Sequence, residues 1–170
     1  MERLILMRHG EAERPASGLE DFDRALDPEG RAESRLMGQV MARAGLEPDL
    51  ALVSSAKRTL ETWRAVAEAF PNDIDLQEDR SLYAASASRM AAAAQLVAPR
   101  GRTLMMVGHN PGIHQYAIHL ARQAGASDAE VRPLSERFPT ASVAVFAMNA
   151  DGGPSFERLL LVKDFRDKIA

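Results

Sequence analysis

Short apolar runs alternate with amphipathic stretches over the first two thirds of the chain. The runs at 4–7, 50–53 and 103–107 are too short to form helices and predict buried strands, and 74–76 predicts a shorter one. Helical periodicity follows them, with glycine, proline and serine at the expected ends. The predicted helices are 28–44, about 57–70, 88–98 and about 112–124.

Three of these helices carry recognisable start signals. Asp27 precedes Pro28, which is typical of an N-cap residue followed by a first-turn proline. The pair Ser54–Ser55 is predicted to cap the second helix, and Asn110–Pro111 the fourth. Arg58 then falls in a first turn, where a cation opposes the helix dipole and needs a partner such as a bound anion.

The last third of the chain changes character. Two β-rich runs, 142–148 and 156–162, flank the loop 149–154 and predict a hairpin. Early strand–helix alternation followed by strand pairing predicts an α/β fold with a mixed, mostly parallel sheet and helices on both faces. With neither an internal repeat nor a linker, residues 1–170 are predicted to form a single domain.

Composition narrows the classes of function. The chain is 46% hydrophobic and has 21 basic and 24 acidic residues without a basic block, so we expect neither a nucleic-acid nor a membrane-surface partner. It has no cysteine, which excludes disulfides, thiolate metal sites and a cysteine nucleophile. The N-terminus lacks a signal-peptide core, and no run approaches the roughly 20 apolar residues of a spanning helix, so a cytoplasmic protein is expected.

Cationic and imidazole side chains follow three of the predicted strands. Arg8 and His9 follow the first, Arg58 lies after the second, and His109 follows the third. Ligands bind at the carboxyl ends of strands in open α/β sheets, so we expect these groups to converge on one anion. Neutral His9 is the candidate nucleophile for a phosphoryl group, and the arginines are suited to its oxygens and lower the pKa of His9. His109 and the backbone near Asn110 are further candidate phosphate ligands.

Each of these residues also has a structural interpretation. His109 alone is explained equally well by a bond to a carbonyl group. Arg8 and Arg58 have nearby carboxylates as candidate ion-pair partners, namely Glu11, Glu61 and Asp21.

Two further histidines, His114 and His119, lie within the fourth predicted helix. Their separation of five residues does not match the i,i+4 spacing of a zinc site, so we expect structural roles for both.

With these residues in place, the chain resembles the histidine phosphatase superfamily, which includes the cofactor-dependent phosphoglycerate mutases, and especially its SixA-type phosphohistidine phosphatases. The resemblance spans nearly the whole chain and is carried by the segments LILMRHGEA, LDPEGRAESRLMG, LALVSSAKRTLET, LMMVGHNPGI and FPTASVAV. It implies a three-layer α/β/α sandwich of the phosphoglycerate mutase type. It also implies phosphorylation of His9, a phosphate pocket of Arg8, Arg58 and His109, and neither a metal nor an organic cofactor. Arg24 is assigned only a rim or structural role.

The acidic proton donor of larger members falls in a segment with two registers. One offers Glu78; the other places Ser81 there and leaves no donor. Phosphohistidine releases imidazole, whose conjugate acid has a pKa of about 6.5, so it tolerates a site without a strong donor. A phosphohistidine-bearing protein is therefore the expected substrate. The alternatives are a small-molecule phosphomonoesterase or mutase, and a non-catalytic phosphate-binding module.

Overall fold

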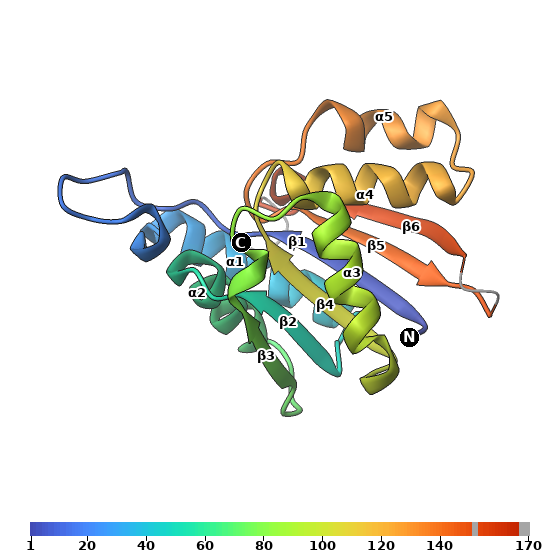
Figure 1. The fold of residues 1–170 in the computed structure, drawn as a ribbon, viewed down its shortest axis with the longest axis horizontal. Coiled ribbons are helices and arrows are strands. Elements are labelled where there is room, and N and C mark those ends of the chain that lie inside the picture. The colour runs from blue at the N-terminus through green and yellow to red at the C-terminus, as the bar shows by residue number, and fades with distance from the viewer. Residues whose placement is uncertain (151–152, 167–170) are drawn as a thin grey trace.

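The computed structural model describes residues 1–150 and 153–166, and a six-stranded sheet forms its centre (Figure 1). The strands lie in the order β3-β2-β4-β1-β5-β6. Their bounds are β1 Arg3–Arg8, β2 Leu50–Ser54, β3 Asp75–Asp79, β4 Thr103–Gly108, β5 Val143–Met148 and β6 Pro154–Leu160. The first four are mutually parallel, whereas β5 runs antiparallel to both β1 and β6. This confirms the mostly parallel mixed sheet and the C-terminal strand pairing.

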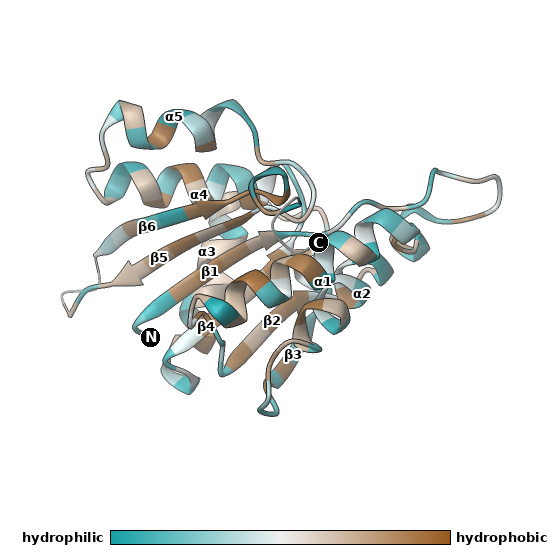
Figure 2. Ribbon diagram, turned by 180° about the vertical axis from the view of Figure 1, so that it is seen from behind, coloured by the Kyte–Doolittle hydropathy of each residue, from teal (hydrophilic) through white to brown (hydrophobic). Residues whose placement is uncertain are grey.

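Five helices cover the two faces of the sheet. Their bounds are α1 Pro28–Arg43, α2 Lys57–Ala67, α3 Ala87–Val97, α4 Gly112–Gln123 and α5 Asp128–Glu136. Helices α1 and α2 lie on one face, and α3 and α4 lie on the other, with α5 packed outside α4 (Figures 1 and 2). The three-layer α/β/α arrangement is therefore confirmed.

Two cores result from the alternation of side chains along the strands. Leu4 and Leu6 of β1 face α3 and α4, whereas Ile5 and Met7 face α1 and α2, and all four are fully buried. Burial on both faces explains why β1 is a continuous apolar run rather than an alternating one. Such a strand fixes the main chain immediately before Arg8 and His9.

The helix starts correct two sequence predictions. Asp27 caps α1 as expected, accepting a hydrogen bond from the Gly30 amide at 2.7 Å. By contrast, α2 begins after Ala56 without a side-chain cap, so the pair Ser54–Ser55 does not cap it. Asn110 does not cap α4 either: its Nδ2 donates to the Phe138 carbonyl, and its Oδ1, the atom that would cap the helix, has no hydrogen-bond partner among the described residues. The side chains of Ser54 and Asn110 are used at the strand ends instead.

Short 3-10 turns complete the chain: η1 Asp21–Asp23, η2 Arg80–Leu82, η3 Ala98–Arg100 and η4 Val162–Asp164. Helix α2 ends at Ala67, three residues before the predicted end. Asp151 and Gly152 of the predicted hairpin loop lie outside the described residues. In the part of the chain that is described, no helix is both long enough and apolar enough to cross a membrane.

Candidate active site

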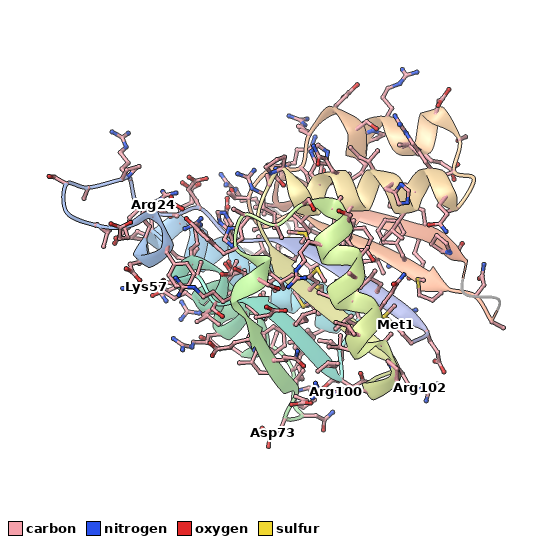
Figure 3. All side chains as sticks on the ribbon, viewed as in Figure 1. Met1, Arg24, Lys57, Asp73, Arg100 and Arg102 are labelled. Carbon is pink, nitrogen blue, oxygen red and sulfur yellow. The ribbon has the colours of Figure 1, made fainter. Side chains whose placement is uncertain are left out.

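The carboxyl ends of β1 and β4 place two histidines side by side. Arg8 pairs with Gly108 in the parallel register, and the His9 amide donates to the Gly108 carbonyl at 3.1 Å. The next residue on each strand is a histidine, and the ring centroids of His9 and His109 lie 5.2 Å apart. Figure 3 shows Arg24 and Lys57 at this end of the molecule and Met1, Arg100 and Arg102 at the opposite end of the sheet. The ends of β1 and β4 therefore bring His9 and His109 together.

The hydrogen bonds of His9 fix its tautomer. Its Nδ1 lies 2.7 Å from the Gly10 carbonyl oxygen, which can only accept, so Nδ1 carries the proton. Its Nε2 receives the Nε–H of Arg58 at 3.4 Å, and a guanidinium can only donate, so Nε2 presents a lone pair. Two independent contacts therefore describe a neutral imidazole whose Nε2 faces the cationic side of the site.

The electrostatic environment also keeps His9 neutral. The side chain is 9% exposed, and burial lowers the pKa of His9 to about 4, with the positive charges of Arg58 and Arg8 acting in the same direction. The bond to the Gly10 carbonyl opposes this shift but does not outweigh it. At neutral pH the Nε2 lone pair is consequently available without prior loss of a proton.

Arg58 contacts both histidines and Asp21. It is 5% exposed and stands in the first turn of α2, as predicted. Besides its contact with His9, its Nη2 lies 3.3 Å from His109 Nδ1 and 3.0 Å from Asp21 Oδ2, and its Nη1 donates to the Asp21 carbonyl at 2.6 Å. One fork-shaped cation thus holds both imidazoles and a carboxylate. Asp21 supplies the negative charge that a cation at a helix start requires.

His109 is buried between this cation and β2. Its Nε2 lies 2.8 Å from the hydroxyl of Ser54, the last residue of β2, and the residue is 5% exposed. Burial lowers the pKa of His109 to about 3, and the neighbouring His9 and Arg58 contribute in the same direction, against the carboxylate of Asp21. Both imidazoles at the strand ends are therefore neutral at physiological pH.

The Arg8 side chain is hydrogen-bonded to the segment between α5 and β5. Its Nη1 donates to the Phe138 carbonyl at 3.0 Å, and the amide Nδ2 of Asn110 donates to the same oxygen at 3.0 Å. Within the described residues, the buried Nε of Arg8 and Oδ1 of Asn110 have no hydrogen-bond partner. A buried guanidinium N–H without a partner is costly, and an anion beside it is one way to satisfy it.

Asp21 and Tyr83 were not predicted as site residues. The sequence offers Asp21 only as an ion-pair partner for arginine, and Asp21 does pair with Arg58 and Arg24. Its carboxylate also binds Arg24 through Oδ1 at 2.8 Å and receives the Tyr83 hydroxyl at 2.7 Å. These contacts, led by the Tyr83 hydrogen bond, hold the pKa of Asp21 far below its usual range, so it is a carboxylate rather than an acid. The Tyr83 ring meets the His109 ring edge-on at 5.5 Å.

The chain is similar to known proteins over most of its length. The model of the histidine phosphatase superfamily (branch 1) matches residues 4–86. An uncharacterized protein of Mycobacterium tuberculosis is 34% identical over 140 residues, which are 82% of this chain and 85% of that protein. The chain belongs to the histidine phosphatase superfamily.

Solved structures of this superfamily share the fold of the chain. A protein assigned as the phosphohistidine phosphatase SixA of Agrobacterium tumefaciens has a TM-score of 0.82 and 28% identity, over 94% of this chain and 98% of that one. A second, the protein histidine phosphatase SixA complexed with tungstate, has a TM-score of 0.79 and 21% identity over 96% and 99%. The second similarity concerns the fold alone.

In this histidine phosphatase superfamily member, Gly10 serves packing. A Cβ added at Gly10 would lie 2.6 Å from the Gly30 carbonyl oxygen and 2.7 Å from the Ser34 hydroxyl, so only glycine lets the turn after β1 pack this closely on α1. The Gly10 amide donates to Thr62 of α2 at 2.9 Å. Contacts with α1 and α2 therefore hold Gly10 in place, and the Gly10 carbonyl orients His9.

The remaining candidates lie outside the hydrogen-bonded cluster. Glu78 is an exposed residue of β3, and within the described residues no hydrogen bond or ion pair joins it to His9, Arg58 or His109. The predicted alternative partners of the arginines are engaged elsewhere: Glu61 with Arg31, and Glu11 with Thr140.

The other two histidines, His114 and His119, lie on α4. His114 contacts the Leu134 carbonyl through Nε2, and His119 is exposed. Among the described residues, no group of three or more histidine and acidic side chains is arranged to hold a metal ion.

Proposed function

We propose that the protein is a phosphatase that takes a phosphoryl group onto Nε2 of His9 and passes it to water. The observation that carries this proposal is the fixed tautomer of His9, with Nδ1–H tied to the Gly10 carbonyl and the Nε2 lone pair turned toward Arg58. A nucleophilic nitrogen held beside an immobile cation matches the requirement of phosphoryl transfer, which is positioning plus charge stabilisation.

The reaction divides into two displacements at phosphorus. In the first, a bond forms between His9 Nε2 and phosphorus while the bond to the leaving group breaks and its electron pair departs with that group. Arg58, Arg8 and His109 are assigned to the equatorial oxygens, where charge is concentrated. In the second, water attacks phosphorus and the electron pair of the P–N bond returns to His9. The neutral imidazole is thereby regenerated.

We infer that the substrate is a phosphohistidine-bearing protein. The carboxylate in contact with the site, Asp21, has a lowered pKa and holds no proton for an alkoxide leaving group. A phosphohistidine protonated on its other ring nitrogen releases neutral imidazole and makes no such demand. The connection from β3 to α3 holds only the short turn η2 rather than an inserted lid. Similarity to SixA phosphatases supports the same choice.

The test is hydrolysis by wild type and His9→Ala of a phosphohistidine protein and a panel of phosphate monoesters. Released phosphate is measured for each. Wild type is expected to prefer the phosphohistidine protein, and His9→Ala to lose activity by at least about 10⁴-fold because the covalent route is removed. His119→Ala is the matched control, since this exposed histidine lies away from the site.

The possible outcomes separate the alternatives. Full activity of His9→Ala contradicts the mechanism. Turnover of monoesters alone contradicts the substrate and favours a small-molecule phosphomonoesterase. Binding of phosphate without turnover of any compound favours the non-catalytic module.

A further inference from the structure

The hydrogen bonds of His109 define its proton position in the ligand-free site. Arg58 Nη2, which can only donate, faces His109 Nδ1 at 3.3 Å, so Nδ1 accepts and the ring proton lies on Nε2. That Nε2–H then points at the Ser54 hydroxyl oxygen, 2.8 Å away, which accepts. His109 and His9 therefore carry their protons on opposite ring nitrogens while both contact the same guanidinium.

A bound phosphate requires the other tautomer. The ring nitrogen of His109 on the Arg58 side is Nδ1, because Nε2 faces Ser54 at the end of β2. The oxygens of a phosphate dianion accept hydrogen bonds, so Nδ1 must carry a proton to contact one. His109 can meet this need by becoming an imidazolium or by changing tautomer. In the ligand-free site, burial first, and then His9, Arg58 and Arg8, lower the pKa of His109 against the opposing carboxylate of Asp21, and this disfavours the imidazolium.

Ser54 is suited to the tautomer change. Its hydroxyl is both donor and acceptor, the residue is fully buried, and within residues 1–150 and 153–166 the hydroxyl has no hydrogen-bond partner besides His109. The hydroxyl is thus free to rotate from accepting the Nε2 proton to donating its own.

We propose that Ser54 is a positioning residue that lets His109 exchange its Nε2–H tautomer for the Nδ1–H tautomer when phosphate replaces its contact with Arg58. In the exchange, Nδ1 gains one proton from water and Nε2 loses one to water, so the ring stays neutral. The Ser54 hydroxyl changes from acceptor to donor. The inference rests on the proposed phosphate site and adds Ser54 to it, a residue that acts on phosphate only through His109.

The direct test is the proton position on His109, measured by ¹⁵N NMR of the imidazole nitrogens at pH 8 with and without inorganic phosphate. The ligand-free protein is expected to carry the proton on Nε2, and the phosphate-bound protein on Nδ1. A proton that stays on Nε2 with phosphate bound overturns the proposal. Protons on both nitrogens overturn it too, because Ser54 is then an acceptor in both states.

Variants of Ser54 provide the functional readout. Ser54→Ala is expected to lower kcat/KM by about 10- to 100-fold, the range found when an outer partner of a functional histidine is removed, and to abolish the phosphate-dependent movement of the His109 proton. Ser54→Thr keeps the hydroxyl and is expected to restore both. Ser142→Ala is the matched control, because Ser142 is equally buried and its hydroxyl has no partner among the described residues.

These results are distinguishable from failure of the proposed function. If wild type binds phosphate, moves the His109 proton and yet hydrolyses no substrate, the enzymatic proposal fails and the role of Ser54 stands. If wild type hydrolyses its substrate and Ser54→Ala is as active as Ser142→Ala, the role of Ser54 is wrong while the mechanism at His9 stands.

Discussion

At the scale of single residues, the site is organised by groups that can act in only one way. The Gly10 carbonyl can only accept and Arg58 can only donate, so the proton positions of His9 and His109 follow from geometry. Burial then keeps both rings neutral, which suits one as a nucleophile and the other as a hydrogen-bond donor to phosphate.

Arg58→Lys is expected to lower kcat/KM by about 10²- to 10³-fold, the cost of losing a preorganised charged donor. Lysine is a point charge and cannot reproduce the separate bonds of Arg58 to His9, His109 and Asp21. Steady-state hydrolysis measures the effect. Arg64→Lys, at an exposed position of the same helix, is the control; an equal loss in both variants contradicts the special role of Arg58.

At the scale of elements, two short turns, η1 and η2, bring Asp21 and Tyr83 to the site. η1 brings Asp21 onto Arg58, and Tyr83, directly after η2, donates its hydroxyl to the same carboxylate. Phe22 and Tyr83 also pack edge-to-face, with ring centroids 5.0 Å apart, so the two turns support each other. Asp21 therefore occupies a donor of Arg58 that the proposed phosphate ligand also requires.

Asp21→Asn is expected to tighten the binding of inorganic phosphate by about 3- to 10-fold. The substitution removes a negative charge beside the proposed anion site, and the partial exposure of Asp21 keeps the gain at about 1 kcal/mol. Titration calorimetry with phosphate measures it. Asp23→Asn changes the same charge in the same turn and is the control. Weaker binding by Asp21→Asn than by Asp23→Asn indicates that Asp21 positions Arg58 instead of competing with phosphate.

The strands marked by apolar runs and the helix marked by a cap and a first-turn proline were predictable from the sequence, and α5 was not. Apolar runs located β1, β2 and β4, and Asp27–Pro28 located the start of α1. Helix α5 was missed, although Ser127 and Glu130 form a capping box, because Pro133 and several charged residues interrupt its apolar periodicity.

The candidate site was predictable only in part for a similar reason. Arg8, His9, Arg58 and His109 follow strands whose carboxyl ends meet at one edge, so topology brings them together. Asp21 and Tyr83 lie in turns, whose placement depends on tertiary contacts rather than on periodicity. The sequence predicts Ser54 as a helix cap, and nothing in its local sequence signals the bond to His109, 55 residues away.

At the scale of the whole molecule, the two buried neutral histidines make the free energy of unfolding depend on pH. The pKa values of His9 and His109 are lowered to about 4 and about 3, below the value of about 6.5 for unfolded histidine. Between pH 6.5 and 4 the unfolded state therefore binds more protons than the folded state, and stability rises with pH. Their contribution is present above pH 6.5 and is lost as the pH falls.

The free energy of unfolding is expected to fall between pH 6.5 and about 4.5, by at most about 1.4 kcal/mol per pH unit for each of the two histidines. Urea denaturation at a series of pH values measures this slope. In the double variant His9→Gln, His109→Gln the slope should be nearly absent over this range. An unchanged slope in that variant contradicts neutral burial of the two rings.

The central claim is that His9 Nε2 carries the phosphoryl group during turnover. Rapid acid-free quenching during hydrolysis of a phosphohistidine protein, followed by mass spectrometry and ³¹P NMR, tests it most directly. The predicted result is a phosphoryl group on Nε2 of His9, because Nδ1–H is held by the Gly10 carbonyl. A phosphoryl group on His109, or sustained turnover with His9 never labelled, contradicts the account.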